Sequence, residues 1–124
     1  MDSLFIKGNF PSFKNSKQFT GKYFIMSKTV QKYLKLWEYQ WKLIPEEFKK
    51  QSVFPIIVGL HFVRGTKHRW DFHNMVQGVA DLMVKHKWIE DDNTLYFLPV
   101  PMKLNDKWWD YDKENPGVYI KILN

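Results

Sequence analysis

The chain has 124 residues, of which 44% are hydrophobic and 18% aromatic, and its formal net charge is +6. This size and apolar content fit one folded domain and exclude a disordered chain, and the absence of cysteine excludes disulfides, thiolate nucleophiles and zinc–thiolate clusters. No apolar run is long enough to cross a bilayer, and the N-terminus lacks the pattern of a signal peptide. We therefore expect a single cytoplasmic domain, residues 1–124, with no membrane partner.

The positive charge lies in the first half of the chain. Residues 1–50 contain ten lysines against four acidic residues, whereas residues 51–124 contain nine basic and nine acidic residues. A basic half joined to a carboxylate-bearing half suits a protein that holds a polyanion and acts on it. A lysine-rich surface that only keeps the protein in solution explains the same charge equally well.

The first half predicts a strand, a loop and a helix. We expect a short strand at residues 4–7, a polar, turn-rich loop at 11–21 and a brief extended piece at 23–26. Ser27 is the expected N-cap of a helix that Pro45 ends. The apolar residues of this helix recur at steps of three and four: Val30, Tyr33, Leu34, Trp37 and Trp41.

The second half predicts three further strands and a second helix. The strands are expected at residues 54–63, 94–100 and 118–123. Asn74 and Gln77 resemble a capping box that opens the second helix. The expected fold is α+β, a single domain with a mixed, mostly antiparallel sheet of about four strands and two main helices packed on it.

The residues that indicate chemistry follow a basic connector at 64–69. If residues 70–73 are extended, Asp71 and His73 project from one face, just ahead of the second helix. Three acids stand in a row at 90–92. Carboxylates of this kind suit Mg²⁺, and an imidazole among them would suit Mn²⁺. In phosphodiester hydrolysis such an ion activates water and neutralises charge on the phosphate.

The spacing leaves open whether these groups can meet. A helix of about 12 residues is about 18 Å long, so Asp71 and the acidic cluster start at opposite ends. Either the extended chain returns along the helix, or a partner subunit completes the site. Each group also has a structural interpretation. Asp71 and Asn74 can cap the helix, residues 90–93 can form an exposed turn, Asp81 can face solvent, and His61 and His86 can be structural, while His68 contacts phosphate or only water.

Together these residues resemble the RusA family of Holliday junction resolvases, phage type. That family has an Asp-x-Asp-Asn-x-x-Lys run opening a helix, an Asp further along it, and an acidic pair opening a strand. Here the run reads Asp71-Phe72-His73-Asn74-Met75-Val76-Gln77, followed by Asp81 and by Asp91-Asp92. The segment 11–17 also looks like the loop after the first strand of phage-type members. The specific part of the resemblance spans residues 69–92.

The resemblance implies a metal-dependent endodeoxyribonuclease that resolves four-way junctions by paired nicking, in recombination and repair. It implies a homodimer that uses Mg²⁺, without a small-molecule cofactor, in a bacterial cell or encoded by a phage. The metal ligands carried over are Asp71, Asp91 and Asp92, with His73 in place of the second Asp. His73 and Gln77, with Asp71 and Asp92, would be the catalytic residues. His73 favours Mn²⁺ and Gln77 keeps a hydrogen bond to phosphate, but both lack the charge of the family's residues.

Two other interpretations remain open. The first is a DNA-junction-binding protein on the same fold that cuts weakly or not at all. Both it and the nuclease would hold DNA through the same residues: Lys14, Asn15, Lys17, Lys22, Arg64, Lys67 and Arg69. The second concerns residues 108–112, an aromatic and acidic stretch that could stack on bases or bind a partner. The neighbouring carboxylates would repel phosphate, so a hairpin loop or dimer contact is favoured there.

Overall fold

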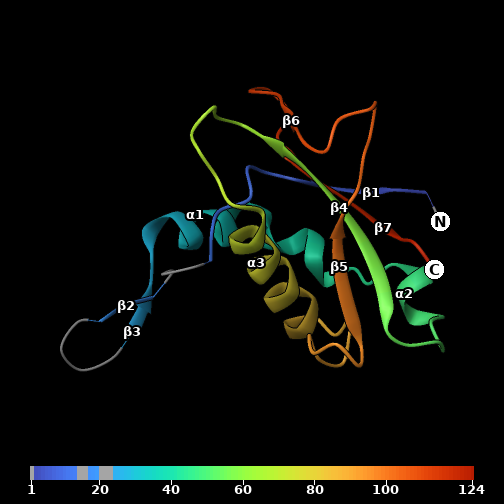
Figure 1. Cartoon of the computed structure of the whole chain (residues 1–124). Helices are drawn as coiled ribbons and strands as arrows, with labels where there is room; N and C mark the ends of the chain where they lie inside the picture. The colour runs from blue at the N-terminus through green and yellow to red at the C-terminus, as the bar shows by residue number, and fades with distance from the viewer. Residues whose placement is uncertain (1, 14–16, 20–23) are drawn as a thin grey trace.

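The computed structural model describes residues 2–13, 17–19 and 24–124, and the strand at its centre is β4 (Ile56–Arg64). This strand pairs antiparallel with β7 (Gly117–Ile122) and parallel with β5 (Phe97–Pro101). Beyond β7 lies β1 (Leu4–Lys7), and the short β6 (Asp110–Tyr111) pairs with the last residues of β4. Within the described residues this is one mixed five-stranded sheet, so the expected α+β fold is confirmed (Figure 1).

Two small elements differ from the sequence-based expectation. The strands β2 (Lys17–Phe19) and β3 (Phe24–Met26) pair antiparallel as a separate hairpin. The prediction of an uninterrupted loop at 11–21 was therefore wrong at β2. The strand β6 was also missed, because two residues are too few to show an alternating pattern.

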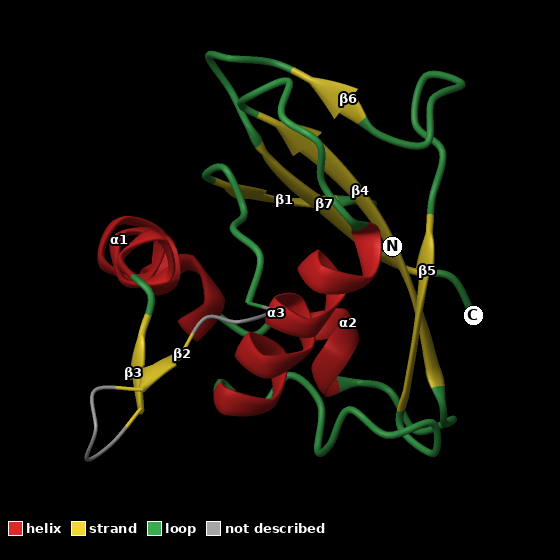
Figure 2. Ribbon diagram, turned by 60° about the vertical axis from the view of Figure 1, so that its left-hand side comes forward, coloured by secondary structure: helices red, strands yellow, loops and turns green. Residues whose placement is uncertain are grey.

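The helices lie on one side of the sheet, as Figure 2 shows. The first, α1 (Lys28–Trp37), begins at the expected N-cap, where Ser27 Oγ accepts from the backbone N–H of Val30 at 3.4 Å. The expected single helix up to Pro45 was wrong, because the chain passes into a 3₁₀ helix, η1 (Glu38–Lys42), and then into α2 (Glu46–Lys49). The expected apolar face is confirmed, since Val30 and Tyr33 are buried.

The longest helix, α3 (Phe72–Lys85), packs its apolar face on the sheet. Its N-cap is Asp71, so the structural interpretation of Asp71 as a cap is confirmed and the capping box predicted at Asn74 was wrong. At its other end Lys87 has a φ of 65°, and Trp88 donates its backbone N–H to the carbonyl of Met83 at 2.8 Å. This left-handed turn closes the helix in the manner usually taken by glycine, so the sequence carries no clear signal for it.

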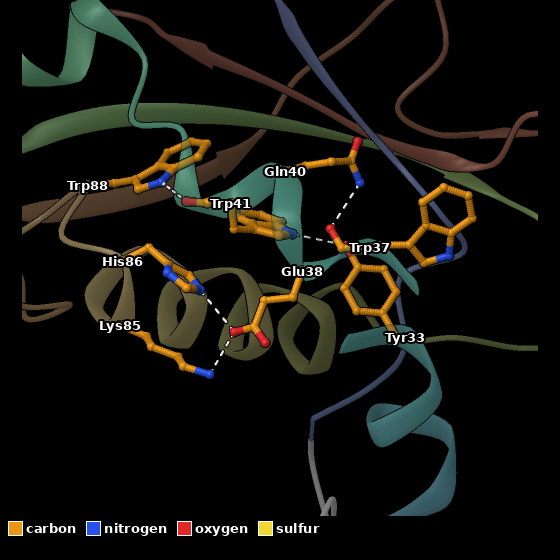
Figure 3. Close-up of polar contacts among 8 residues, drawn as sticks. All are labelled: Tyr33, Trp37, Glu38, Gln40, Trp41, Lys85, His86 and Trp88. Atoms are coloured by element: carbon orange, nitrogen blue, oxygen red, sulfur yellow. Dashed lines mark hydrogen bonds and ion pairs between the residues drawn. The ribbon is translucent and has the colours of Figure 1, made fainter. Parts of the chain in front are cut away.

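A polar clamp joins η1 to the C-terminal end of α3 (Figure 3). The Glu38 carboxylate accepts from Lys85 Nζ at 2.6 Å and lies 2.9 Å from His86 Nε2. Burial of this carboxylate raises its pKa, but the hydrogen bonds and charges of Lys85 and His86 together outweigh burial, so the pKa of Glu38 is lowered. The prediction that His86 is structural agrees with this position.

Next to the clamp, three aromatic residues of the core are linked by hydrogen bonds. Trp88 Nε1 donates to the carbonyl of Trp41 at 2.6 Å, and Trp41 Nε1 donates to the Tyr33 hydroxyl at 3.1 Å (Figure 3). Burial raises the pKa of the Tyr33 hydroxyl, with the bond from Trp41 opposing it only in part. These bonds satisfy polar atoms that would be costly to bury alone. No helix in the described part of the chain is long and apolar enough to cross a membrane.

Candidate nucleic-acid interface

The N-terminal end of α3 carries the first group of predicted site residues. Asp71 Oδ1 accepts from the backbone N–H of His73 at 2.9 Å, which is the bond an N-cap makes. Because Phe72 is already helical, residues 70–73 are not extended, and the predicted alternation that placed Asp71 and His73 on one face was wrong. Both side chains are exposed. Asp71 therefore has a structural role whatever else it binds.

A pocket of about 640 Å³ lies beside this helix end, and we call it the α3-end pocket. Its lining includes Arg64, His68, Arg69, Asp71 and Asn74. The structure thus gathers one predicted metal ligand and two predicted DNA contacts around one cavity. A pocket with cationic groups beside the first turn of a helix is suited to an anionic backbone, although the Asp71 carboxylate opposes phosphate unless a cation intervenes.

Arg64 is the buried member of this group. Its Nη1 donates to the carbonyl of Phe10 at 2.6 Å, and its guanidinium carbon lies 5.4 Å from the centre of the Trp70 ring. Burial lowers the pKa of Arg64, and its Nε is buried without a hydrogen-bond partner in the described structure. Arg64 therefore anchors the first loop to the core, and its predicted contact with DNA stays a prediction.

The other predicted DNA contacts fall into three groups. Lys67 and Arg69 are exposed on the connector between β4 and α3, with Lys67 Nζ 5.0 Å from the centre of the Tyr111 ring. Lys17 lies in β2. Three more predicted contacts lie outside the described residues: Lys14, Asn15 and Lys22.

The acidic turn lies at the far end of α3 (Figure 1). Both oxygens of the Asp91 carboxylate are engaged locally, one by the backbone N–H of Asp92 at 2.7 Å and the other by the Asn93 amide at 2.9 Å. Asp92 is exposed. The 14 residues of α3 separate this turn from Asp71 by about 20 Å of helix. One chain does not bring the two ends of the predicted site together.

The described residues of one chain do not fit a metal centre. Among residues 2–13, 17–19 and 24–124, no three His, Asp or Glu side chains are arranged to hold an ion. Hard cations bind several oxygen ligands at short range, and water or phosphate can supply part of that set. The predicted use of Mg²⁺ or Mn²⁺ stays a prediction.

Gln77 and Asp81 form a pair of their own on the exposed side of α3. The Gln77 amide donates to the Asp81 carboxylate at 3.0 Å, one helical turn apart. Gln77 is not among the residues that line the α3-end pocket, and its predicted contact with phosphate stays a prediction. The His61 imidazole, predicted to be structural, is buried with Nδ1 2.9 Å from the carbonyl of Met102.

A second pocket, of about 660 Å³, lies on the other side of the connector. We call it the tryptophan pocket, and its lining includes Lys67, His68, Arg69, Trp70, Trp108 and Trp109. The sequence interpretation favoured a hairpin loop or dimer contact at 108–112 and did not place these two tryptophans beside the basic connector. The pairing of β6 with the end of β4, which brings them there, has no signal in the sequence beyond the Trp-Trp pair itself.

Comparison with family models and with curated proteins identified no relative of this chain. The chain matches no protein-family model and no curated protein sequence. The resemblance to the RusA family therefore rests on the residues of the chain itself, above all residues 69–92.

Proposed function

We propose that this protein is a RusA-type endonuclease of branched DNA that holds its substrate at the N-terminal end of α3 and cuts it only as a homodimer. The observation that carries the proposal is the α3-end pocket, where Asp71 lies with Arg64 and Arg69. Asp71 and Arg69 belong to the segment that resembles the family. Cationic side chains at the pocket would bind the phosphate backbone, in a manner that is independent of base sequence.

A homodimer could bring the two separated acidic groups together across its interface. Asp71 precedes α3, which is about 20 Å long, and the turn that carries Asp92 follows the other end of this helix. In a two-fold symmetric dimer, a residue of one subunit can contact a different residue of its partner, and the same contact then occurs twice. We propose that Asp92 of the partner subunit approaches the α3-end pocket and supplies the carboxylate missing there. The described residues of one chain hold no group of three such ligands, so carboxylates of both subunits would hold the metal.

Complementation between two variants tests this arrangement. Asp71→Asn and Asp92→Asn are each expected to abolish metal-dependent nicking of a labelled four-way junction in Mg²⁺ or Mn²⁺, with a chelator as the blank. If the site is shared, mixing the two inactive proteins restores activity, because a mixed dimer contains one site with both carboxylates intact. Asp112→Asn, which removes an exposed carboxylate remote from both groups in sequence, is the matched control.

The mixing experiment distinguishes a shared site from a site within one chain. Activity in the mixture but in neither variant alone supports the shared site. Activity that both single variants lose and mixing does not restore contradicts the shared site and favours one within a single chain. Nicking that persists in both variants contradicts the assignment of these carboxylates.

A second candidate function is junction binding without cutting. The engaged oxygens of Asp91 and Asp71 favour it, since both carboxylates already satisfy local N–H groups. Tight binding of a four-way junction, compared with linear duplex, with no nicking in either metal would establish this function and remove the nuclease.

A further inference from the structure

Two exposed tryptophans stand side by side in sequence at the edge of the tryptophan pocket. The side chains of Trp108 and Trp109 are 55% and 45% exposed, whereas Trp41 and Trp88 are buried. Two adjacent exposed rings make a contiguous apolar surface, and contiguous surfaces mark binding sites more often than single exposed side chains do. In the folded chain it lies against a basic connector, a combination that suits a planar, anionic partner.

The local carboxylates, which the sequence suggested would repel phosphate, are balanced in the structure. Asp106 lies 3.8 Å from Lys103 Nζ, and Asp110 lies 3.6 Å from Lys107 Nζ. The pKa of Asp110 is lowered, first by the hydrogen bond from the backbone N–H of Tyr111 and then by the charge of Lys107. Together they outweigh the opposing effect of slight burial. Asp106 and Asp110 are therefore paired with lysines of the same loop, and Asp112 accepts from the backbone N–H groups of Glu114 and Asn115. The pocket lining itself includes the basic residues Lys67 and Arg69.

Both tryptophan rings have a neighbour in the folded chain, and for Trp108 it is Lys103, whose Nζ lies 5.1 Å from the ring centre. Trp109 packs edge-on against Trp70, with ring centroids 5.5 Å apart. The loop turns at Asn105 and Asp106, both with positive φ, between the mutually bonded backbones of Leu104 and Lys107. A turn of this kind matches the twist of the flanking chain. Preorganised rings lose little entropy on binding.

We propose that the tryptophan pocket takes an unpaired base of a DNA strand, stacked on Trp108 or Trp109, with the adjoining phosphates on the connector. Every base has an aromatic face, so stacking of this kind is tolerant of sequence, and Lys67 and Arg69 would neutralise the backbone. This inference rests on the proposed function, because it names the part of branched DNA that the protein holds: the unpaired nucleotide at a branch point.

The neighbouring pocket supports a strand rather than an isolated base. His68, Arg69 and Trp70 line both the tryptophan pocket and the α3-end pocket, so the two cavities share one wall. A base in the first would place its own strand across the connector, close to Asp71 in the second. Recognition of an unpaired base would thereby position the backbone of that strand at the proposed site of cutting.

The test is the binding of a fluorescein-labelled oligothymidylate to the full chain, followed by anisotropy. The probe is compared with an oligomer of the same length that carries abasic sites, which keeps the phosphates and removes the bases. We expect the abasic oligomer to bind about tenfold more weakly, the loss of one stacked base. Trp108→Ala should weaken the binding of oligothymidylate by a similar factor and leave the binding of the abasic oligomer unchanged. Trp108→Phe should restore most of the affinity for oligothymidylate.

The matched control is Tyr39→Ala, which removes another exposed aromatic side chain, on η1 and outside this pocket, and should bind like the unmodified protein. Equal binding of thymidylate and abasic oligomers by the unmodified protein would overturn the proposal even if a variant failed to fold. Tighter binding of oligouridylate than of oligothymidylate would overturn the assignment to DNA. A junction that is bound and cut while Trp108→Ala and Trp109→Ala each leave binding unchanged removes this inference alone. Tryptophan-dependent oligomer binding without junction binding removes the proposed function instead.

Discussion

Asp71 caps α3 by accepting the backbone N–H of His73 at 2.9 Å, so one predicted metal ligand holds the backbone of another. The bond needs only one carboxylate oxygen, and an amide oxygen in the same place would make it as well. The structural role of Asp71 and its proposed chemical role can therefore be separated by substitution.

We predict that Asp71→Asn keeps the free energy of unfolding within a few tenths of a kcal/mol, because Asn is as good an N-cap as Asp, whereas Asp71→Ala lowers it by about 1 kcal/mol. Urea denaturation measures both. Ser27→Ala, which removes the equivalent cap of α1, is the matched control and should cost a similar amount. If Asp71→Asn is as destabilising as Asp71→Ala, the charge rather than the cap supports the helix.

The dependence of DNA binding on salt reports which cations contact phosphate. Lys67 is exposed on the connector, so we predict that Lys67→Ala reduces the slope of log K against log salt by about 1. Lys121→Ala, which removes a lysine from β7, should leave the slope unchanged. Equal slopes for Lys67→Ala and the unmodified protein would remove Lys67 from the interface. The measurement is a titration of labelled junction at several salt concentrations.

The sequence predicted the long, strongly patterned elements well. The run of β-branched residues gave β4, and the three- and four-residue spacing gave the buried face of α1. The start of α3 was placed at Asn74 rather than at Asp71, because Asp and Asn are both good N-caps and only the backbone decides between them. Local propensity could not predict this choice.

The candidate site was predictable only in part. Asp71 and Arg69 are near in sequence, so their shared pocket follows from the local chain. The approach of Trp109 to Trp70 depends instead on the pairing of β6 with β4, a long-range contact of two residues. Such a contact leaves no periodic pattern, so a single sequence gives it no weight.

The clamp at Glu38 should make stability depend on pH in the acid range. Its pKa is lowered in the folded protein, so this carboxylate contributes stability that is present above its ordinary pKa of 4.5 and lost as pH falls through the folded value. We predict that Glu38→Gln lowers the free energy of unfolding by about 0.5–1 kcal/mol at neutral pH and by less in acid. Urea denaturation at the two pH values measures the difference. Glu47→Gln, at an exposed position of α2, is the control, and a constant difference for Glu38→Gln at all pH values would contradict the prediction.

The hydroxyl of Tyr33 should matter at both neutral and alkaline pH. It accepts the Nε1–H of buried Trp41 at 3.1 Å, so Tyr33→Phe leaves that N–H without its partner. We predict a loss of about 1–3 kcal/mol in the free energy of unfolding at neutral pH.

The alkaline branch follows from burial, which raises the pKa of Tyr33 above its ordinary value of 10.0. The unfolded chain releases the proton first, so the stability that depends on the protonated hydroxyl is present below pH 10.0 and falls as pH rises past it. Tyr33→Phe has no proton to release, so its deficit relative to the unmodified protein should shrink above that pH. Tyr39→Phe, at an exposed tyrosine, should show neither effect. A deficit that stays constant through the alkaline range would mean that Tyr33 ionises as readily folded as unfolded.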